Sequence, residues 1–283
     1  MDAQLLIRIV ETYTKPGETI LDQMAGSGTT MLACMLGRNV VLVELEERFV
    51  KMCQDNWEKV KMHHQLGYEM GTCQIIQGDA RQLENILCDK IISSPPYESS
   101  VSDGKESPLV GGNEKKYGRW KKGTAKKISY TQSGEPCKVD NIITSPPYEG
   151  AMDGGSRHTK GGIPKRDKAM KRIGSYDTVN RANIGNLYKD SYLSAMLQVY
   201  QGCFSVLRAG GLMILVTKNF IRDRKEVRLD LDTIKLCEQA GFALKERWYR
   251  ELPAQSFWRV LYHRKYPSAP QLKYEDILVF LKV

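Results

Sequence analysis

The stretch "ETILDQMAGSGTTMLACMLG", residues 18–37, reads as a short apolar strand, a turn that contains two glycines, and a helix. Glycines allow the chain to turn sharply after a strand and allow a ligand to approach the backbone. The helix pattern ends at Gly37, a residue typical of helix C-caps. Open parallel sheets bind ligands at the carboxyl ends of their strands, so this turn predicts a ligand site.

After the turn, strand and helix patterns alternate along the chain. Apolar strands are expected at 39–45, 73–80, 89–94, 212–219 and 276–283, and helices at 46–64, 81–88, 191–207 and 229–241. Nearly continuous apolar strands that alternate with helices are typical of a parallel sheet covered on both faces. The sequence therefore predicts an α/β protein with a Rossmann-like, mostly parallel twisted sheet and helices on both faces.

The composition is that of an ordinary globular chain, with 41% hydrophobic and 27% charged residues. Its apolar runs are too short to cross a bilayer, and its first residues show no secretory signal. The seven cysteines are never spaced as Cys-x-x-Cys, which favours a reducing compartment over a disulfide scaffold or a zinc site. We therefore expect a cytoplasmic protein with no metal and no membrane partner.

Two acids follow the glycine turn at the ends of the next strands. Glu44 ends the second strand, where an acid suits ribose hydroxyls, and Asp79 ends the third, where an acid suits an adenine amino group. No Gly-Lys-Ser/Thr follows the turn, and Met31 stands at the third glycine of the dinucleotide pattern. A nucleoside without phosphates, such as S-adenosylmethionine, fits this set. The alternative is a turn that only packs a helix, beside two solvated acids.

A Ser-Pro-Pro-Tyr tetrad ends an apolar strand twice, in "DKIISSPPYES" (89–99) and in "DNIITSPPYEG" (140–150). The serine hydroxyl is a fixed hydrogen-bond acceptor at the strand tip. The prolines have a fixed φ and no N–H, so their carbonyls stay aimed, and the tyrosine offers a flat face. Together these groups predict a clamp for a planar ring with an exocyclic amino group, such as an extruded nucleobase.

These motifs in combination resemble the amino-group DNA methyltransferases, which make N4-methylcytosine or N6-methyladenine. The resemblance covers most of 15–97 and 190–283. It implies that S-adenosylmethionine lies in the glycine turn and that the amino nitrogen of a flipped base attacks its methyl group directly. The implied cofactor-binding residues are Asp22, Ala25, Gly26, Ser27, Gly28, Thr29, Thr30, Glu44 and Asp79. The implied catalytic residues are Ser94, Pro95, Pro96, Tyr97, Ser145, Pro146, Pro147 and Tyr148.

The resemblance predicts a site-specific DNA methyltransferase. Serine in the first tetrad position favours cytosine N4 over adenine N6. Two alternatives stay open: an RNA base methyltransferase, and a nucleic-acid-binding protein that kept the fold without catalysis. Gln23 and Met24 follow Asp22 where the family usually has a proline and an aromatic residue, which changes the floor under the cofactor.

Only one tetrad copy can end the fourth strand beside the cofactor. The first copy follows a helix pattern directly, whereas "TQSGEPCK" (131–138) before the second copy reads as a turn. A parallel crossover usually contains a helix. The sequence therefore favours Ser94–Tyr97 at this position, and the other copy is expected to hold a flanking or partner base.

The net charge of +9 lies in one quarter of the chain, because residues 105–172 hold 16 Lys and Arg against 7 Asp and Glu. Such localisation indicates a polyanionic partner, although most lysine-rich runs are simply solvated. We expect double-stranded DNA as the partner, with a restriction endonuclease as a possible companion. The expected DNA-binding residues are Lys115, Lys116, Tyr117, Arg119, Trp120, Lys121, Lys122, Arg157, Lys160, Lys165 and Arg166.

The predicted organisation has three parts. Residues 1–97 form the cofactor-binding half, 98–190 a basic insert that faces DNA, and 191–283 the second half of the same domain. The aromatic and basic segment 255–267 fits either packing at the sheet edge or a second DNA contact.

Overall fold

A computed structural model describes residues 1–90, 138–147, 182–222, 224–252 and 257–283. The expectations for Ser94–Tyr97, for Tyr148 and for the eleven DNA-binding residues between 115 and 166 fall outside these ranges. They stay predictions.

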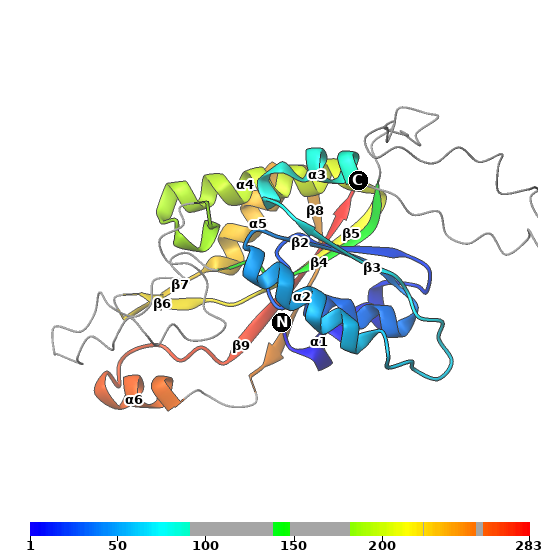
Figure 1. The fold of residues 1–283 in the computed structure, drawn as a ribbon. Coiled ribbons are helices and arrows are strands. Elements are labelled where there is room, and N and C mark those ends of the chain that lie inside the picture. Colours follow the sequence, from blue (N-terminus) through cyan, green and yellow to red (C-terminus); the bar gives the residue numbers. More distant parts are fainter. Residues whose placement is uncertain (91–137, 148–181, 223, 253–256) are drawn as a thin grey trace, which may run out of the picture.

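A seven-stranded sheet forms the centre of the protein, in the order β3-β2-β1-β4-β5-β9-β8 (Figure 1). Its strands are β1 (Thr19–Asp22), β2 (Asn39–Glu44), β3 (Cys73–Gln77), β4 (Val139–Thr144), β5 (Leu207–Thr217), β8 (Phe242–Glu251) and β9 (Tyr274–Lys282). The first five are parallel neighbours, and β9 runs antiparallel to both β5 and β8. The predicted Rossmann-like, mostly parallel sheet is therefore confirmed.

Helices cover both faces of this sheet (Figure 1). The helices of the described residues are α1 (Ala3–Tyr13), the 3-10 helix η1 (Thr29–Leu36), α2 (Glu47–Val60), η2 (Ala80–Gln82), α3 (Leu83–Lys90), η3 (Ile184–Asn186), α4 (Lys189–Val206), α5 (Leu229–Gln239) and α6 (Phe257–Lys265). Helix α6 lies away from the sheet in Figure 1. The strands β6 (Phe220–Arg222) and β7 (Lys225–Val227) form a separate pair. Along β1, Leu21 belongs to the hydrophobic cluster that includes residues of α3, α4 and α5, whereas Ile20 belongs to the cluster that includes residues of α1 and η1. The strands are apolar throughout because both faces are buried.

The second tetrad copy, not the first, supplies the fourth strand, so the preference for Ser94–Tyr97 at this position is wrong. β4 lies between β1 and β5 and is parallel to both. Its Asn141 is 2% exposed and donates a hydrogen bond to Glu18 Oε2 at 2.9 Å. The first copy has Lys90 at the equivalent place, and its longer cationic side chain would have to be buried there.

The helix directly before the first tetrad copy was a misleading signal, because the connection between two parallel strands has a minimum length but no fixed length. Helix α3 ends at Lys90 and precedes β4, which begins at Val139. A helix thus comes before the strand, as expected, but not directly before it. β4 also lies inside the range 98–190 that the sequence assigns to the basic insert, so the central sheet takes one strand from that range.

The segment 255–267 and the lengths of the helices bear on two of the sequence predictions. The segment 255–267 contains helix α6, and its contact with DNA stays a prediction. Across the part of the chain that the structure describes, no helix is both long and apolar enough to span a membrane.

Replacing Asn141 by Lys, which converts this position to that of the first copy, is expected to lower the free energy of unfolding by about 1–3 kcal/mol, because a cation would be buried at the sheet centre. Urea unfolding measures this loss. Lys138→Asn, at the exposed position before β4, is the control and should change stability little. An Asn141→Lys variant as stable as the wild type would contradict this account of the strand choice.

Candidate active site

The glycine turn after β1 needs glycine for two physical reasons. Gly26 and Gly28 have φ angles of 56° and 79°, in the left-handed region that side chains disfavour. A Cβ atom on Gly28 would also lie 2.6 Å from the end of the Met31 side chain and 2.9 Å from Cys53 Sγ. The backbone N–H of Gly26 donates to Glu44 Oε2 at 2.8 Å, so the turn is held against the end of β2.

Asp22 is buried beneath this turn, with 4% of its surface exposed. Its Oδ2 accepts a hydrogen bond from Thr30 Oγ1 at 2.5 Å, and its Oδ1 accepts bonds from Thr144 Oγ1 at 2.7 Å and from the Met24 N–H at 3.2 Å. Burial raises the pKa of Asp22, and the bonds from Thr30 and Thr144 offset part of that rise. The carboxylate thus connects β1, η1 and β4 through hydrogen bonds, and it holds the glycine turn in place.

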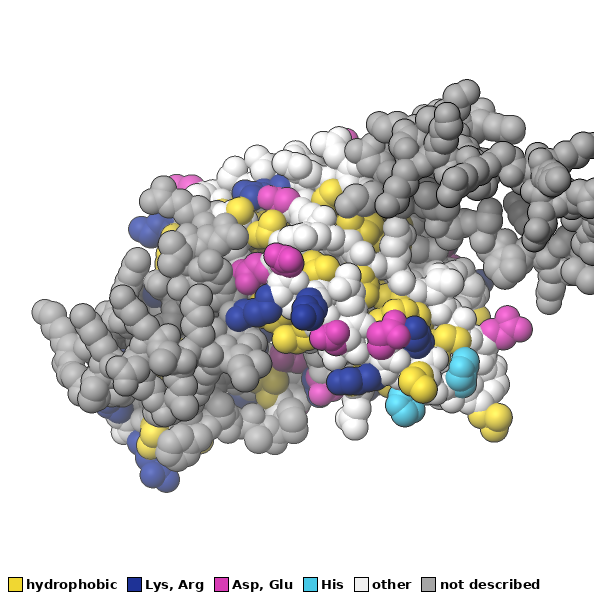
Figure 2. Space-filling model, viewed as in Figure 1, with side chains coloured by type: hydrophobic (Ala, Val, Ile, Leu, Met, Phe, Trp, Pro, Cys, Tyr) yellow, Lys and Arg dark blue, Asp and Glu magenta, His cyan; other side chains and the backbone are white. Residues whose placement is uncertain are grey.

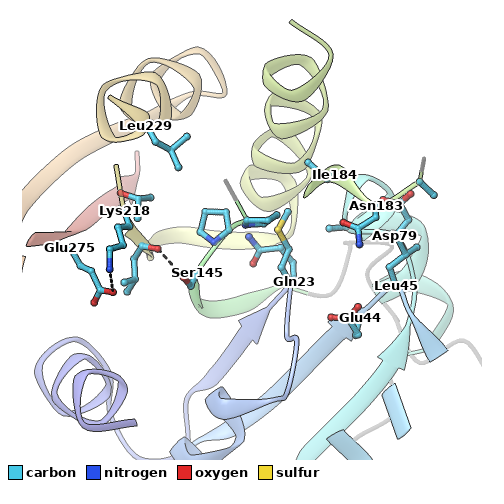
Figure 3. A pocket seen from close by; sticks show the side chains of 18 residues that line it. Gln23, Glu44, Leu45, Asp79, Ser145, Asn183, Ile184, Lys218, Leu229 and Glu275 are labelled. Carbon is cyan, nitrogen blue, oxygen red and sulfur yellow. Dashed lines mark hydrogen bonds and ion pairs between the residues drawn. The ribbon is translucent and has the colours of Figure 1, made fainter. Parts of the chain in front are cut away.

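Two cavities open at the carboxyl edge of the sheet. The larger, of about 460 Å³, is lined by Gln23, Met24, Glu44, Leu45, Gly78, Asp79, Ala80, Ser145, Pro146, Pro147, Ala182, Asn183, Ile184, Val216, Thr217, Lys218, Leu229 and Glu275 (Figure 3). The smaller, of about 190 Å³, lies over the glycine turn and is lined by Met1, Asp22, Met24, Ala25, Gly26, Ser27, Thr29, Thr30 and Ser145. Ser145 lines both. The structure therefore brings most predicted cofactor residues together with the second tetrad, while Gly28 contributes through the shape of the turn.

Glu44 is held by the backbone with its carboxylate at the cavity. Its Oε2 accepts from the Gly26 N–H, and its Oε1 accepts from the Glu46 N–H at 3.0 Å. Burial raises the pKa of Glu44, and these backbone bonds partly oppose the rise. Each carboxylate oxygen can accept a further hydrogen bond. The two oxygens therefore suit the two hydroxyls of a ribose, as the sequence predicts.

Asp79 lines the larger cavity, and both of its carboxylate oxygens accept hydrogen bonds from Arg81. Arg81 Nε donates to Oδ1 at 2.9 Å, its Nη2 donates to Oδ2 at 2.5 Å, and its backbone N–H donates to Oδ1 at 3.0 Å. Burial acts to raise the pKa of Asp79, but the bonds from Arg81 outweigh it and leave the pKa below its usual value. Arg81 also reaches the carbonyl of Ala182 at 3.2 Å, which connects this acid to the wall of the cavity.

The described part of the second tetrad, Ser145–Pro147, favours accepting hydrogen bonds. Ser145 Oγ donates its one proton to the carbonyl of Val216 at 3.0 Å, the dashed line in Figure 3, so its lone pairs are what it offers a ligand. The Pro147 carbonyl accepts a bond from the buried Tyr192 hydroxyl at 2.7 Å. Pro146 lines the same cavity and has no N–H to donate to a ligand.

Three residues of the site were not assigned from sequence. Asn183 Oδ1 accepts a hydrogen bond from the Gly185 N–H at the start of η3, and its Nδ2 donates to Glu46 Oε1 at 3.0 Å beside the cavity. Gln23 and Thr217 line the cavity at the tips of β1 and β5. Gln23 had a sequence signal, the departure from the family pattern after Asp22, whereas Thr217 had none.

On the face seen in Figure 2, basic and acidic side chains lie interspersed, in keeping with the balance of charges outside residues 105–172. Within the described residues, no group of three or more His, Cys, Asp and Glu side chains could hold a metal ion.

Comparison with known proteins finds a family match over the first part of the chain. Residues 1–55 match the N6_N4_Mtase family model, described as a DNA methylase. The resemblance to the amino-methyltransferase family is confirmed. The match also confirms the predicted cofactor, S-adenosylmethionine. The residues fit this methyltransferase cofactor, because Glu44 would hold the ribose and the turn at Gly26 would take the methionine end.

One curated relative is the ribosomal protein L11 methyltransferase of Staphylococcus carnosus, which is 26% identical over 87 residues. The match spans 30% of this chain and 27% of that relative's length. The chain thus resembles about a quarter of the length of a protein that is itself a methyltransferase.

Solved structures of methyltransferases are also similar at a low level. TrmN from Thermus thermophilus has 15% identity and a TM-score of 0.45, with 99% of this chain and 48% of that chain covered. A methyltransferase from Methanosarcina mazei has 9% identity and a TM-score of 0.46, with 97% of both chains covered. These scores are too low to carry an argument, and the fold assignment rests on the strand order given above.

Replacing Asp22 by Asn is expected to lower the free energy of unfolding by about 1–3 kcal/mol, because an amide cannot accept all three hydrogen bonds and leaves a buried donor or acceptor unpaired. Cofactor affinity should fall with it, since the turn loses its support. Urea unfolding and calorimetric titration with S-adenosylmethionine measure the two effects. Asp55→Asn, an exposed change on α2, is the control; equal stability of the two variants would contradict the role of Asp22.

Cofactor affinity is expected to fall on acidification at a pH above the ordinary range for a glutamate. The reason is that burial raises the pKa of Glu44, and its protonated form accepts hydrogen bonds from ribose hydroxyls less well than the carboxylate does. Glu44→Gln should remove this pH dependence and weaken binding about 10-fold, or about 1.4 kcal/mol. Titrations across a pH series test it, with Glu47→Gln at the exposed start of α2 as control. The same pH dependence in Glu44→Gln would refute the assignment.

Proposed function

We propose that this protein transfers a methyl group from S-adenosylmethionine to the exocyclic amino group of a base in DNA, with cytosine N4 favoured over adenine N6. The observation that carries the proposal is the position of Ser145 and Pro146 in one cavity with Glu44, at the tip of the strand beside the glycine turn. A clamp for an amine-bearing ring and a site for a nucleoside cofactor thus share one opening.

The chemistry follows from what these groups accept. The bound cofactor supplies an electrophilic methyl group on a sulfonium. The lone pair of an aromatic amine is delocalised into its ring, which makes the nitrogen a weak nucleophile. A hydrogen bond from one of its N–H groups to Ser145 Oγ would orient the nitrogen and increase its electron density. The nitrogen forms a bond to the methyl carbon as the sulfur–carbon bond breaks, and one N–H proton then leaves to solvent.

Two observations support DNA as the substrate. The family model that matches residues 1–55 is described as a DNA methylase. The charge excess in residues 105–172, with Tyr117 and Trp120 among its lysines, has the composition expected of a segment that binds phosphates and stacks on bases. Serine at the head of the tetrad favours cytosine. A companion restriction endonuclease remains part of this proposal.

Transfer of a tritiated methyl group to duplex DNA and to RNA, measured side by side, tests the proposal. We expect incorporation into duplex DNA. Ser145→Ala should lower kcat about 10–100-fold, because a positioned hydrogen-bond acceptor is lost at the reacting nitrogen, while cofactor affinity stays within a few-fold.

The matched control is Ser94→Ala, the same change in the other tetrad copy, which should affect turnover less because the second copy follows β4. A larger loss in Ser94→Ala would move the clamp to the first copy. Methyl transfer to RNA alone would replace DNA by RNA in the proposal. Cofactor binding without transfer to either nucleic acid would overturn it.

A further inference from the structure

Gln23 and Thr217 are buried polar side chains that lack hydrogen-bond partners in the described part of the chain. Gln23 is 1% exposed and Thr217 is 2% exposed. Neither Nε2 nor Oε1 of Gln23 is bonded, and neither is Oγ1 of Thr217; the remaining such atom among the described residues is Nδ1 of His263, on α6. Both Gln23 and Thr217 line the larger cavity.

Such groups are uncommon in folded proteins. An amide or hydroxyl that leaves water without finding a partner loses its hydrogen bonds to solvent and gains nothing in return. The other polar side chains of this cavity that the sequence assigns to the site differ in this respect, because Glu44, Asp79 and Ser145 each have partners within the fold. Gln23 and Thr217 are therefore the groups whose hydrogen bonds a ligand would complete.

Their places in the sheet indicate which part of the cavity they serve. Gln23 directly follows β1, and Thr217 is the last residue of β5. β4 runs between these strands, so the two residues flank Ser145 at its tip. In Figure 3, Gln23 lies between Ser145 and Glu44. The two unpartnered groups thus border the cavity from the two strands next to the clamp.

We propose that Gln23 and Thr217 bind the polar ring edge of the target base and so determine which base is accepted. This inference rests on the proposed function. Oε1 of Gln23 accepts an N–H of the exocyclic amine, and its Nε2 donates to the adjacent ring nitrogen, N3 of cytosine or N1 of adenine. The Thr217 hydroxyl donates to the next position along the same edge. Cytosine has an accepting oxygen there, whereas adenine has a carbon-bound hydrogen.

The methionine end of the cofactor is the competing occupant. The smaller cavity over the glycine turn suits that end, and neither Gln23 nor Thr217 lines it. Thr217 also lies beyond β4 from the turn, two strands from β1. The base is therefore the occupant that both residues can reach together.

The test uses Gln23→Leu and Thr217→Val, which keep the approximate shape of each side chain and remove its polar atoms, with the exposed Gln54→Leu on α2 as control. Three quantities are measured: the urea midpoint, the affinity for S-adenosylmethionine, and kcat/KM on DNA substrates that offer cytosine or adenine. We expect Gln23→Leu to raise the urea midpoint, to keep cofactor affinity within 2-fold and to lower kcat/KM at least 10-fold. Thr217→Val should lower the preference for cytosine over adenine at least 10-fold.

Each other outcome overturns the inference in a recognisable way. A 10-fold loss of cofactor affinity in Gln23→Leu would assign the amide to the cofactor. A lower urea midpoint with unchanged kcat/KM would make Gln23 a structural residue. An active wild type with an unchanged base preference in Thr217→Val would remove Thr217 from base recognition. A wild type that binds the cofactor and methylates no nucleic acid would overturn the proposed function itself, and this inference with it.

Discussion

The buried carboxylate of Asp22 is the constraint on which the site depends. It accepts hydrogen bonds from Thr30, at the start of η1, and from Thr144, the last residue of β4. Because Ser145 is the next residue in the chain, these bonds set the position of the tetrad relative to the glycine turn. In the proposed reaction, the core of the protein rather than a surface loop would set the distance between the methyl donor and the acceptor ring.

The residues around the cavity divide into two groups by their hydrogen bonding. Glu44, Asp79 and Ser145 are held by the fold and keep accepting capacity for a ligand. Gln23 and Thr217 are buried without hydrogen-bond partners among the described residues, which costs stability in the free protein. A site of this kind is preorganised by the first group and selective through the second, since unpaired donors and acceptors favour only ligands that complement them.

Much of the fold could be predicted from the sequence because its signals are local. Apolar runs predicted β1, β2 and β3. Because Glu44 and Asp79 stand at the ends of these strands, their positions beside the glycine turn could be predicted as well. The choice between two nearly identical tetrad strands could not be predicted, since it depends on the burial of Asn141 and on pairing with β1 and β5. The bonding of Arg81 to Asp79 and the burial of Gln23 likewise arise only when distant segments pack. Strand β8 gave no apolar signal because most of its side chains are exposed.

A crystal structure with S-adenosylhomocysteine and a duplex that carries the target base would test the central claim most directly. The account predicts the ribose hydroxyls on Glu44, the sulfur directed toward the tip of β4, and the amino group of the extruded base on Ser145 Oγ. A cofactor bound away from the glycine turn, or a sulfur that faces neither tetrad, would contradict it.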